Sequence, residues 1–170
     1  CSYCHISTEK GDIGNLRLKS VDRVMQEIEI LKNLGVQKLF FEDDSLFAKR
    51  QRIIDIFKAV ADMQLTIADV NGVNLVHLFK KSPQGLVPDE SFMEMLYAAG
   101  FQQIVFPVES ASQRILNKYA TGKLNHNLMD VVHLVHVASR VGILCPVNMM
   151  IGFPDETEEE MLRSVELGKK

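Results

Sequence analysis

Apolar residues in this chain follow two spacings, one typical of helices and one typical of short buried strands. Between Val21 and Leu34 they recur every three or four residues, with Ser20 placed to cap the start and Gly35 to end the segment. Residues 38–41 follow as a buried strand, in which Leu39, Phe40 and Phe41 form a continuous apolar run. The pattern therefore predicts a helix followed by a strand.

The same pairing recurs to the end of the chain. Thr157 and Glu160 form a capping box for a last helix, and Ile115 and Leu116 belong to a shorter helical segment. We expect a loop around Pro83. The other predicted strands are 65–70, 104–108 and 143–151, and the other predicted helices are 49–63, 89–99 and 127–141. Alternating strands and helices of this kind are the signature of an α/β fold with parallel strands.

Composition narrows the class of protein. A chain of 170 residues with 46% hydrophobic residues is expected to bury one core, so we predict one domain over residues 1–170. The chain begins at Cys1 without a methionine and ends inside a predicted helix, so we expect both ends to lie within a longer protein. No apolar run is long enough to predict a membrane span. The net charge of −3 does not predict a nucleic-acid-binding surface, which is usually basic. Three cysteines are too few for a disulfide-rich protein, so we expect a reducing, cytoplasmic location.

Polar side chains occur where each predicted strand ends. In parallel α/β folds the carboxyl ends of the strands meet at one rim, where ligands bind. Any one of these residues could instead cap the helix that follows. The residues are Glu42, Asp43, Asp44, Asn71, Asn74, Glu109, Ser110 and Asn148. Together they predict a polar site at the rim, without indicating its ligand.

The segment Cys1-Ser2-Tyr3-Cys4 is a C-x-x-C motif, which suits zinc, a redox dithiol or an iron–sulfur cluster. A zinc site needs a second pair of ligands, and Cys145 lies in a predicted strand where a buried, inert thiol is expected. A thioredoxin-like motif would open a helix, whereas a polar loop follows Cys4. The motif alone leaves these alternatives open.

At this point the sequence resembles the radical S-adenosylmethionine (SAM) superfamily, in particular its branch with B12-binding domains or methylthiotransferase-like architecture. Cys1, Tyr3 and Cys4 match the end of the family's C-x-x-x-C-x-aromatic-C motif. The first cysteine of that motif would lie four residues before Cys1. The resemblance implies a partial parallel (β/α)6 TIM-like barrel whose first and last strands lie outside the chain.

Later segments carry the resemblance through the chain. Residues 41–44 stand where the family has Gly-Gly-Glu, although the glycines are absent, and residues 108–116 look like its fourth-strand segment. Residues 148–155 resemble the motif G-x-I-x-G-x-x-E, with Asp155 in place of Glu.

The resemblance implies an enzyme, a transferase among the options, that cleaves SAM reductively at a [4Fe-4S] cluster to give a 5′-deoxyadenosyl radical. It implies an electron donor such as flavodoxin or ferredoxin, and allows cobalamin in the full-length protein. The implied cluster ligands are Cys1 and Cys4, and the implied SAM-binding residues are Tyr3, Glu42, Asp43, Asp44, Glu109, Ser110, Asn148, Met150 and Gly152. The substrate stays open between methyl transfer, methylthio transfer, cyclisation and rearrangement.

Two alternatives remain at the sequence level: a zinc-binding protein on an α/β scaffold, and a non-catalytic scaffold domain. Both leave the agreement between the four predicted strand ends unexplained. The 170 residues alone are expected to be inactive, because they supply too few cluster ligands.

Overall fold

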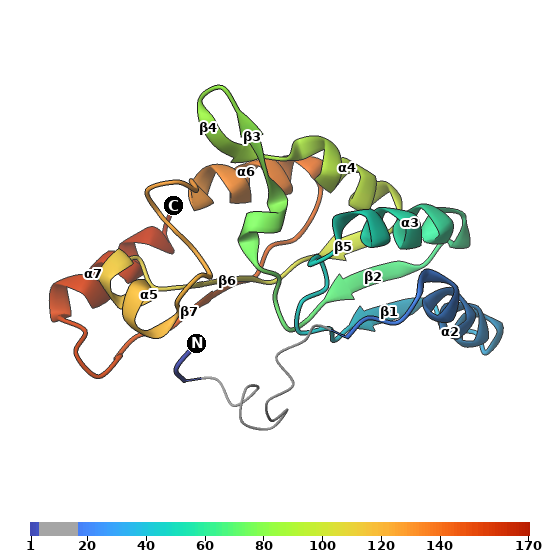
Figure 1. Ribbon diagram of the computed structural model, residues 1–170, viewed down its shortest axis with the longest axis horizontal. Helices are drawn as coiled ribbons and strands as arrows, with labels where there is room; N and C mark the ends of the chain where they lie inside the picture. The colour runs from blue at the N-terminus through green and yellow to red at the C-terminus, as the bar shows by residue number, and fades with distance from the viewer. Residues whose placement is uncertain (4–16) are drawn as a thin grey trace.

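A computed structural model describes residues 1–3 and 17–170, so the predicted cluster ligand Cys4 lies outside the described residues. Three parallel strands form one sheet in the order β1 (Lys38–Phe41), β2 (Thr66–Asp69) and β5 (Phe101–Gln103). A second parallel pair consists of β6 (Phe106–Glu109) and β7 (Val147–Met149). Figure 1 shows these strands following one another across the molecule.

The third strand of the structure consists of β5 and β6. β6 overlaps the range predicted for this strand, 104–108, whereas β5 precedes that range and was not predicted. The two are linked to the fourth strand by a continuous set of backbone bonds: Leu144 N donates to Gln102 O at 2.8 Å, and Ile104 N donates to Leu144 O at 3.0 Å. The third strand is interrupted because Val105 N donates to the Asp69 carboxylate, at 3.1 Å, instead of joining the ladder. The four predicted strands therefore form one parallel series.

Six α-helices and two short 3₁₀ turns are seen in the described residues. Ser20 caps the first helix by accepting a bond from Arg23 N, and the predicted capping box of Thr157 and Glu160 is present. Both caps confirm the sequence prediction. The helices are α2 (Val21–Asn33), α3 (Arg50–Val60), α4 (Glu90–Ala98), α5 (Gln113–Tyr119), α6 (Val131–Val141) and α7 (Glu158–Leu167), and the turns are η1 (Ala61–Met63) and η2 (Leu75–Leu78).

Two local predictions were wrong. The helix expected from residue 127 begins at Val131, because the Asp130 side chain accepts a bond from His133 N and so caps the helix there. The expected loop around Pro83 is the turn of an antiparallel hairpin made of β3 (Phe79–Ser82) and β4 (Gly85–Pro88). Its short strands carry too little alternation to be recognised from the sequence.

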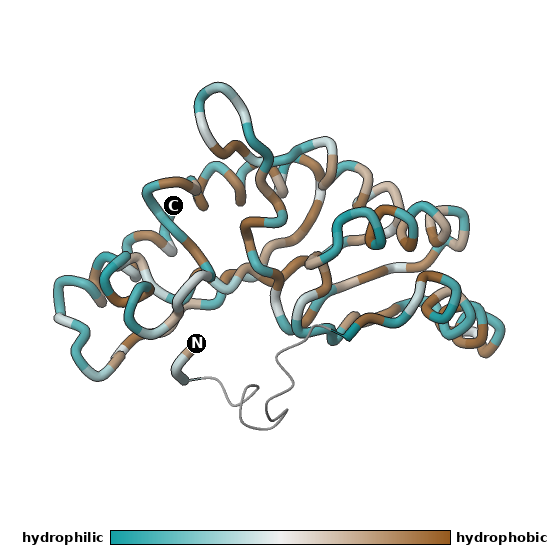
Figure 2. Tube along the Cα trace, viewed as in Figure 1, coloured by the Kyte–Doolittle hydropathy of each residue, from teal (hydrophilic) through white to brown (hydrophobic). Residues whose placement is uncertain are grey.

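The core lies between the strands and the helices α3, α4 and α6. Phe57 and Phe101 contact edge to face with their ring centroids 5.2 Å apart, and Phe47 packs on the same Phe101. Figure 2 shows hydrophobic and hydrophilic residues alternating along the helices, as one-sided burial requires. In the described ranges, no helix is both long and apolar enough to cross a membrane.

Candidate functional site

The ends of neighbouring strands lie together at one rim. The Asn71 side chain donates to Glu42 O at 2.8 Å, which joins the segments that follow β1 and β2. Met150 N donates to Glu109 O at 2.7 Å, which joins the segments that follow β6 and β7. These bonds arise because all four strands are parallel and carry their polar residues at the same end.

A cavity of about 390 Å³ opens at this rim. Its wall includes an acidic and a basic side chain, Asp44 and Lys123. Gly72 is required in this wall, because it has a φ of +85° and an added Cβ would lie 3.3 Å from the Pro107 ring. The lining residues are Asp44, Ser45, Asn71, Gly72, Val73, Asn74, Pro107 and Lys123. The predicted residues Glu42 and Asp43 line a different cavity, of about 330 Å³, between α2 and β1.

Glu109 is held in an unusual backbone conformation. Its φ is +68°, and Ser110 N donates to Val108 O at 2.9 Å across it, which makes a tight γ-turn. The Glu109 side chain is buried and forms an ion pair with Lys123 Nζ at 2.5 Å. Strained backbone of this kind occurs where a side chain must be aimed precisely at a site. The γ-turn thus fixes the Glu109 carboxylate against Lys123 of the rim cavity.

The other predicted residues of these two strands differ in their surroundings. The Ser110 hydroxyl accepts a bond from Ser112 N at 3.1 Å and donates to Glu156 at 3.4 Å, so it is already engaged with the segment before α7. Asn148 lies on the last strand, Met150 directly follows that strand, and both are exposed. His126, which the sequence did not single out, contacts Ser110 O at 2.9 Å.

The start of the chain packs against the Gly-Phe-Pro segment near its end. Ser2 N donates to Tyr119 O at 2.9 Å, and the Tyr3 and Phe153 ring centroids are 5.7 Å apart. A cavity of about 310 Å³ lies between these parts, lined by Ser2, Tyr3, Tyr119, Met150, Ile151, Gly152, Phe153 and Pro154. Figure 1 shows the N-terminus beside α5 and β7. The first and last motifs of the sequence therefore meet at one cavity.

One glycine of this cavity and two cysteines of the chain have distinct conformations and environments. Gly152 has a φ of +94°, and an added Cβ would meet no atom of the described residues within 4 Å, so its backbone conformation is the observed reason for glycine there. Cys1 is an exposed free thiol. Cys145 is partly buried, and burial raises the pKa of its thiol to about 12, as expected for an unreactive cysteine.

A group of charged residues ties α5 to the start of α7. Arg114 forms two bonds to Glu160, at 3.0 and 2.5 Å, and one to the Asp155 carboxylate at 3.0 Å. Lys118 and the Tyr119 hydroxyl also donate to Asp155. Lys118 and then Tyr119 hold the pKa of Asp155 well below its usual value, and Arg114 followed by Ser112 does the same for the pKa of Glu160.

This group was not predicted from the sequence, although Asp155 and Glu160 were each noted there for other reasons. One signal was present: Arg114 and Lys118 are four residues apart and so share a helix face, while an acidic run begins at Asp155. Sequence spacing does not show that the two segments touch.

Asp69 was not predicted as a site residue either. It is fully buried at the end of β2, where one carboxylate oxygen accepts bonds from Gly72 N at 3.0 Å and Val105 N at 3.1 Å. The other oxygen, Oδ1, has no hydrogen-bond partner among the described residues, and burial raises the pKa of this carboxyl. Asp69 therefore shapes the rim by joining the loop after β2 to the break between β5 and β6.

A family model and individual relatives point to the same group of proteins. The family description "Radical SAM superfamily" matches residues 1–168. The uncharacterized methyltransferase PH0819 of Pyrococcus horikoshii is 29% identical over 171 residues, covering 100% of this chain and 34% of that protein. The tRNA-2-methylthio-N(6)-dimethylallyladenosine synthase of Pelobacter propionicus is 24% identical, covering 98% of this chain and 37% of that protein. The chain thus spans about a third of the length of these relatives.

Solved structures show the same fold. The radical SAM methyltransferase TsrM from Kitasatospora setae, solved with cobalamin and a [4Fe-4S] cluster bound, has a TM-score of 0.70 at 19% sequence identity. The likeness covers 89% of this chain and 29% of that one. The prediction of a partial α/β barrel with parallel strands is confirmed.

Proposed function

This chain belongs to the radical SAM superfamily, and from that premise we propose that it forms the part of an enzyme that holds SAM against a [4Fe-4S] cluster. One observation carries the proposal. Ser2 and Tyr3, next to the predicted ligand Cys1, line the same cavity as residues 150–154, which resemble an adenine-binding motif.

The residues at this cavity fit such a group. Aromatic and aliphatic walls formed by Tyr3, Met150 and Phe153 suit the flat face of an adenine ring. Cys1 offers a free, exposed thiol at the adjoining end. We assign Cys1 and Cys4 to the cluster and Tyr3, Met150 and Gly152 to the adenine.

The rim cavity suits the amino-acid end of SAM. Asp44 supplies a carboxylate that complements the ammonium group of SAM. Lys123 is paired with Glu109, so it would share its ammonium group between Glu109 and the carboxylate of SAM. Asp44 is therefore the favoured member of the three acidic candidates, over Glu42 and Asp43. Glu109, fixed by its γ-turn, is assigned with Ser110 to the ribose. Asn148 of β7 pairs with Pro107 of the neighbouring β6.

The division of labour between cofactor and protein follows from these assignments. A cluster with bound SAM supplies one-electron reductive cleavage of the sulfonium to methionine and a 5′-deoxyadenosyl radical, with the electron coming from a donor such as flavodoxin or ferredoxin. The residues of the chain orient the sulfonium through contacts at both ends of SAM and keep water from the adenine.

We further propose that the full-length protein is a group-transfer enzyme for methyl or methylthio groups. The relatives described above are named as an uncharacterized methyltransferase and as a tRNA-2-methylthio-N(6)-dimethylallyladenosine synthase. Cobalamin would belong to the methyl-transfer version of this reaction, since TsrM is solved with cobalamin bound.

The test uses full-length protein reconstituted with iron and sulfide without oxygen, then incubated with SAM and a reductant. We expect iron uptake and formation of 5′-deoxyadenosine. Cys1→Ala should abolish both, whereas Cys145→Ala, the matched control on a partly buried thiol, should preserve both. Cluster retention and SAM cleavage by the Cys1→Ala variant would contradict the proposal, and so would a wild-type protein that binds zinc and leaves SAM intact.

A further inference from the structure

Tyr119 lies at the end of α5, outside every motif that carries the resemblance. It nevertheless contacts Ser2, in the segment that begins at Cys1 and carries the C-x-x-C motif; this segment is called the cysteine loop below. Its carbonyl oxygen accepts from Ser2 N at 2.9 Å and from the Ser2 hydroxyl at 3.4 Å. We propose that Tyr119 is a positioning residue that docks the cysteine loop against the segment 150–154. This inference rests on the function proposed above and names a residue that would help to position the ligand Cys1 of its cluster.

The aromatic rings of Tyr119 and Tyr3 contact the same partner. Tyr119 stacks on Phe153 with the centroids 5.1 Å apart and the planes 22° from parallel. Tyr3 contacts Phe153 at 5.7 Å in a tilted arrangement. Phe153 is buried, so its ring links α5 to the residue that precedes Cys4. Offset and tilted contacts of this kind are favourable aromatic geometries, and they restrict how the loop can approach.

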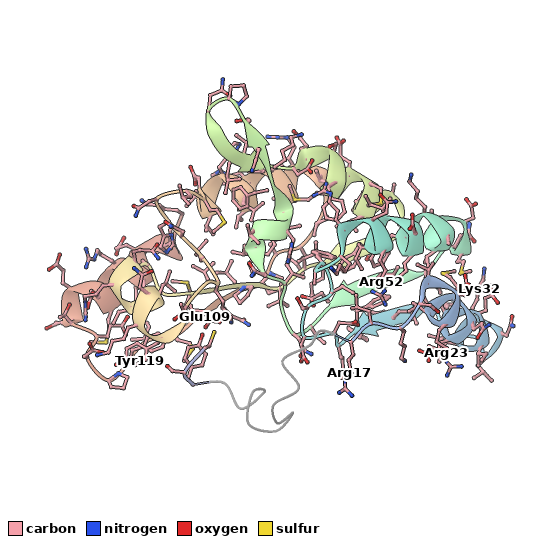
Figure 3. The ribbon with its side chains drawn as sticks, in the orientation of Figure 1. Arg17, Arg23, Lys32, Arg52, Glu109 and Tyr119 are labelled. Atoms are coloured by element: carbon pink, nitrogen blue, oxygen red, sulfur yellow. The ribbon has the colours of Figure 1, made fainter. Side chains whose placement is uncertain are left out.

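The hydroxyl group of Tyr119 sets the orientation of its ring. Its hydroxyl donates to Asp155, which also accepts from Lys118 at 2.8 Å and from Arg114 at 3.0 Å. Arg114 is in turn held by Glu160 of α7. Figure 3 shows Tyr119 at this end of the molecule, below α5 and near the N-terminus. The contacts between α5 and the start of α7 therefore hold the Tyr119 ring in place independently of the cysteine loop.

This arrangement separates two contributions of Tyr119. The bond from Ser2 N uses the backbone carbonyl and survives any change of side chain. The stacking on Phe153 needs a flat ring, and the bond to Asp155 needs the hydroxyl. Because Phe153 and Tyr119 both line the 310 Å³ cavity, loss of the ring enlarges that cavity and frees the loop to shift. The Cys1 thiolate would then be held less firmly in place.

The test compares cluster lability in full-length protein reconstituted without oxygen. Three variants are used: Tyr119→Leu removes ring and hydroxyl, Tyr119→Phe keeps the ring, and Tyr97→Leu makes the same change at an exposed tyrosine of α4. The measurements are the rate of iron loss to a ferrous chelator and the change that SAM produces in the electron paramagnetic resonance spectrum of the reduced cluster. Thermal melting of each apoprotein checks folding.

We expect Tyr119→Leu to lose iron about tenfold faster than wild type, the effect of roughly 1.4 kcal/mol of lost docking. Its SAM-induced spectral change should be weaker. Tyr119→Phe should restore slow iron loss, and Tyr97→Leu should match wild type. If Tyr119→Leu does not fold, Tyr119→Met, which removes the flat ring while filling the space, takes its place.

The outcomes are distinguishable. Equal iron loss from the Tyr119→Leu and Tyr97→Leu variants, with a wild-type spectral response to SAM, would overturn the positioning role and leave the proposed function intact. A wild-type protein that takes up no cluster would overturn the proposed function and this inference with it.

Discussion

At the scale of single residues, Gly100 shows how a close backbone contact constrains the chain between α4 and β5. It has a φ of +97°, and an added Cβ would lie 2.0 Å from Leu65 O. Its own carbonyl accepts from Ile67 N at 2.8 Å, so the backbone cannot move away without breaking the pairing of β2 with β5.

We therefore expect Gly100→Ala to lower the free energy of unfolding by about 3 kcal/mol or more, through combined steric and conformational strain. Gly35→Ala is the matched control, because Gly35 has a φ of +87° and no atom of residues 1–3 or 17–170 lies within 4 Å of an added Cβ. It should cost only about 1 kcal/mol, the usual penalty for a left-handed residue with a side chain. Urea unfolding of both variants measures the difference, and equal costs would refute the steric explanation.

Glu109 and Lys123 form a second residue-scale feature with a measurable consequence. The Glu109 side chain is 8% exposed and that of Lys123 is 31% exposed, so Lys123→Met leaves a mostly buried carboxylate without its cation. We expect this variant to be destabilised by about 1–2 kcal/mol, a discounted value because Lys123 reaches solvent.

The double variant Lys123→Met/Glu109→Gln should recover part of that loss, because no buried charge is then left unpaired. Denaturant titration of the two variants and the wild type tests this. A double variant less stable than the single one would show that the Glu109 carboxylate has another partner.

At the scale of elements, the contacts between α5 and α7 depend on ionised side chains. Both Asp155 and Glu160 have a lowered pKa in the folded protein, caused first by Lys118 and Arg114 respectively. A carboxyl with a lowered folded pKa contributes stability that is present above its unfolded pKa and lost as the pH falls through its folded pKa. These contacts should therefore stabilise the protein at neutral pH and weaken in acid.

Arg114→Gln should accordingly lower the melting temperature at pH 7, and the difference from wild type should shrink as the pH falls below the usual Glu value of 4.5. Melting curves recorded across this range provide the test. Arg23→Gln, on an exposed pair with Glu27 within α2, serves as control and should change little at any pH. A difference that grows in acid would contradict the assignment.

At the scale of the whole molecule, the strands differ in how many neighbours they have. β2 lies between β1 and β5, whereas β1 pairs on one side only within the described residues. Ile67 of β2 is fully buried, while Phe40 of β1 is 54% exposed. Protection of backbone amides should follow this order, because a parallel strand with one neighbour pairs only half of its amides.

We expect hydrogen exchange in the 170-residue chain to be slowest in β2 and β5 and at least about tenfold faster in β1. Exchange followed by mass spectrometry of peptides from these strands tests the expectation. Equal protection of β1 and β2 would indicate that another segment, or a second copy of the chain, covers the free edge of β1.

Local features were predictable from the sequence by itself. The strand Lys38–Phe41, the N-cap at Ser20 and the capping box of Thr157 and Glu160 all appear where the spacing of apolar and polar residues predicts them. These features are stabilised by interactions between residues at most a few positions apart, so a short stretch of sequence is enough to predict them. The polar ends of the strands were predictable for the same reason.

Only the tertiary structure decided which of these segments meet. Tyr3 and Phe153 share a cavity although they are 150 positions apart in the sequence, and Arg114 binds Glu160, 46 positions away. The bond from Val105 N to Asp69, which divides the third strand, likewise joins positions 36 residues apart. Such contacts depend on the order and curvature of the parallel strands, and local spacing carries no information about either.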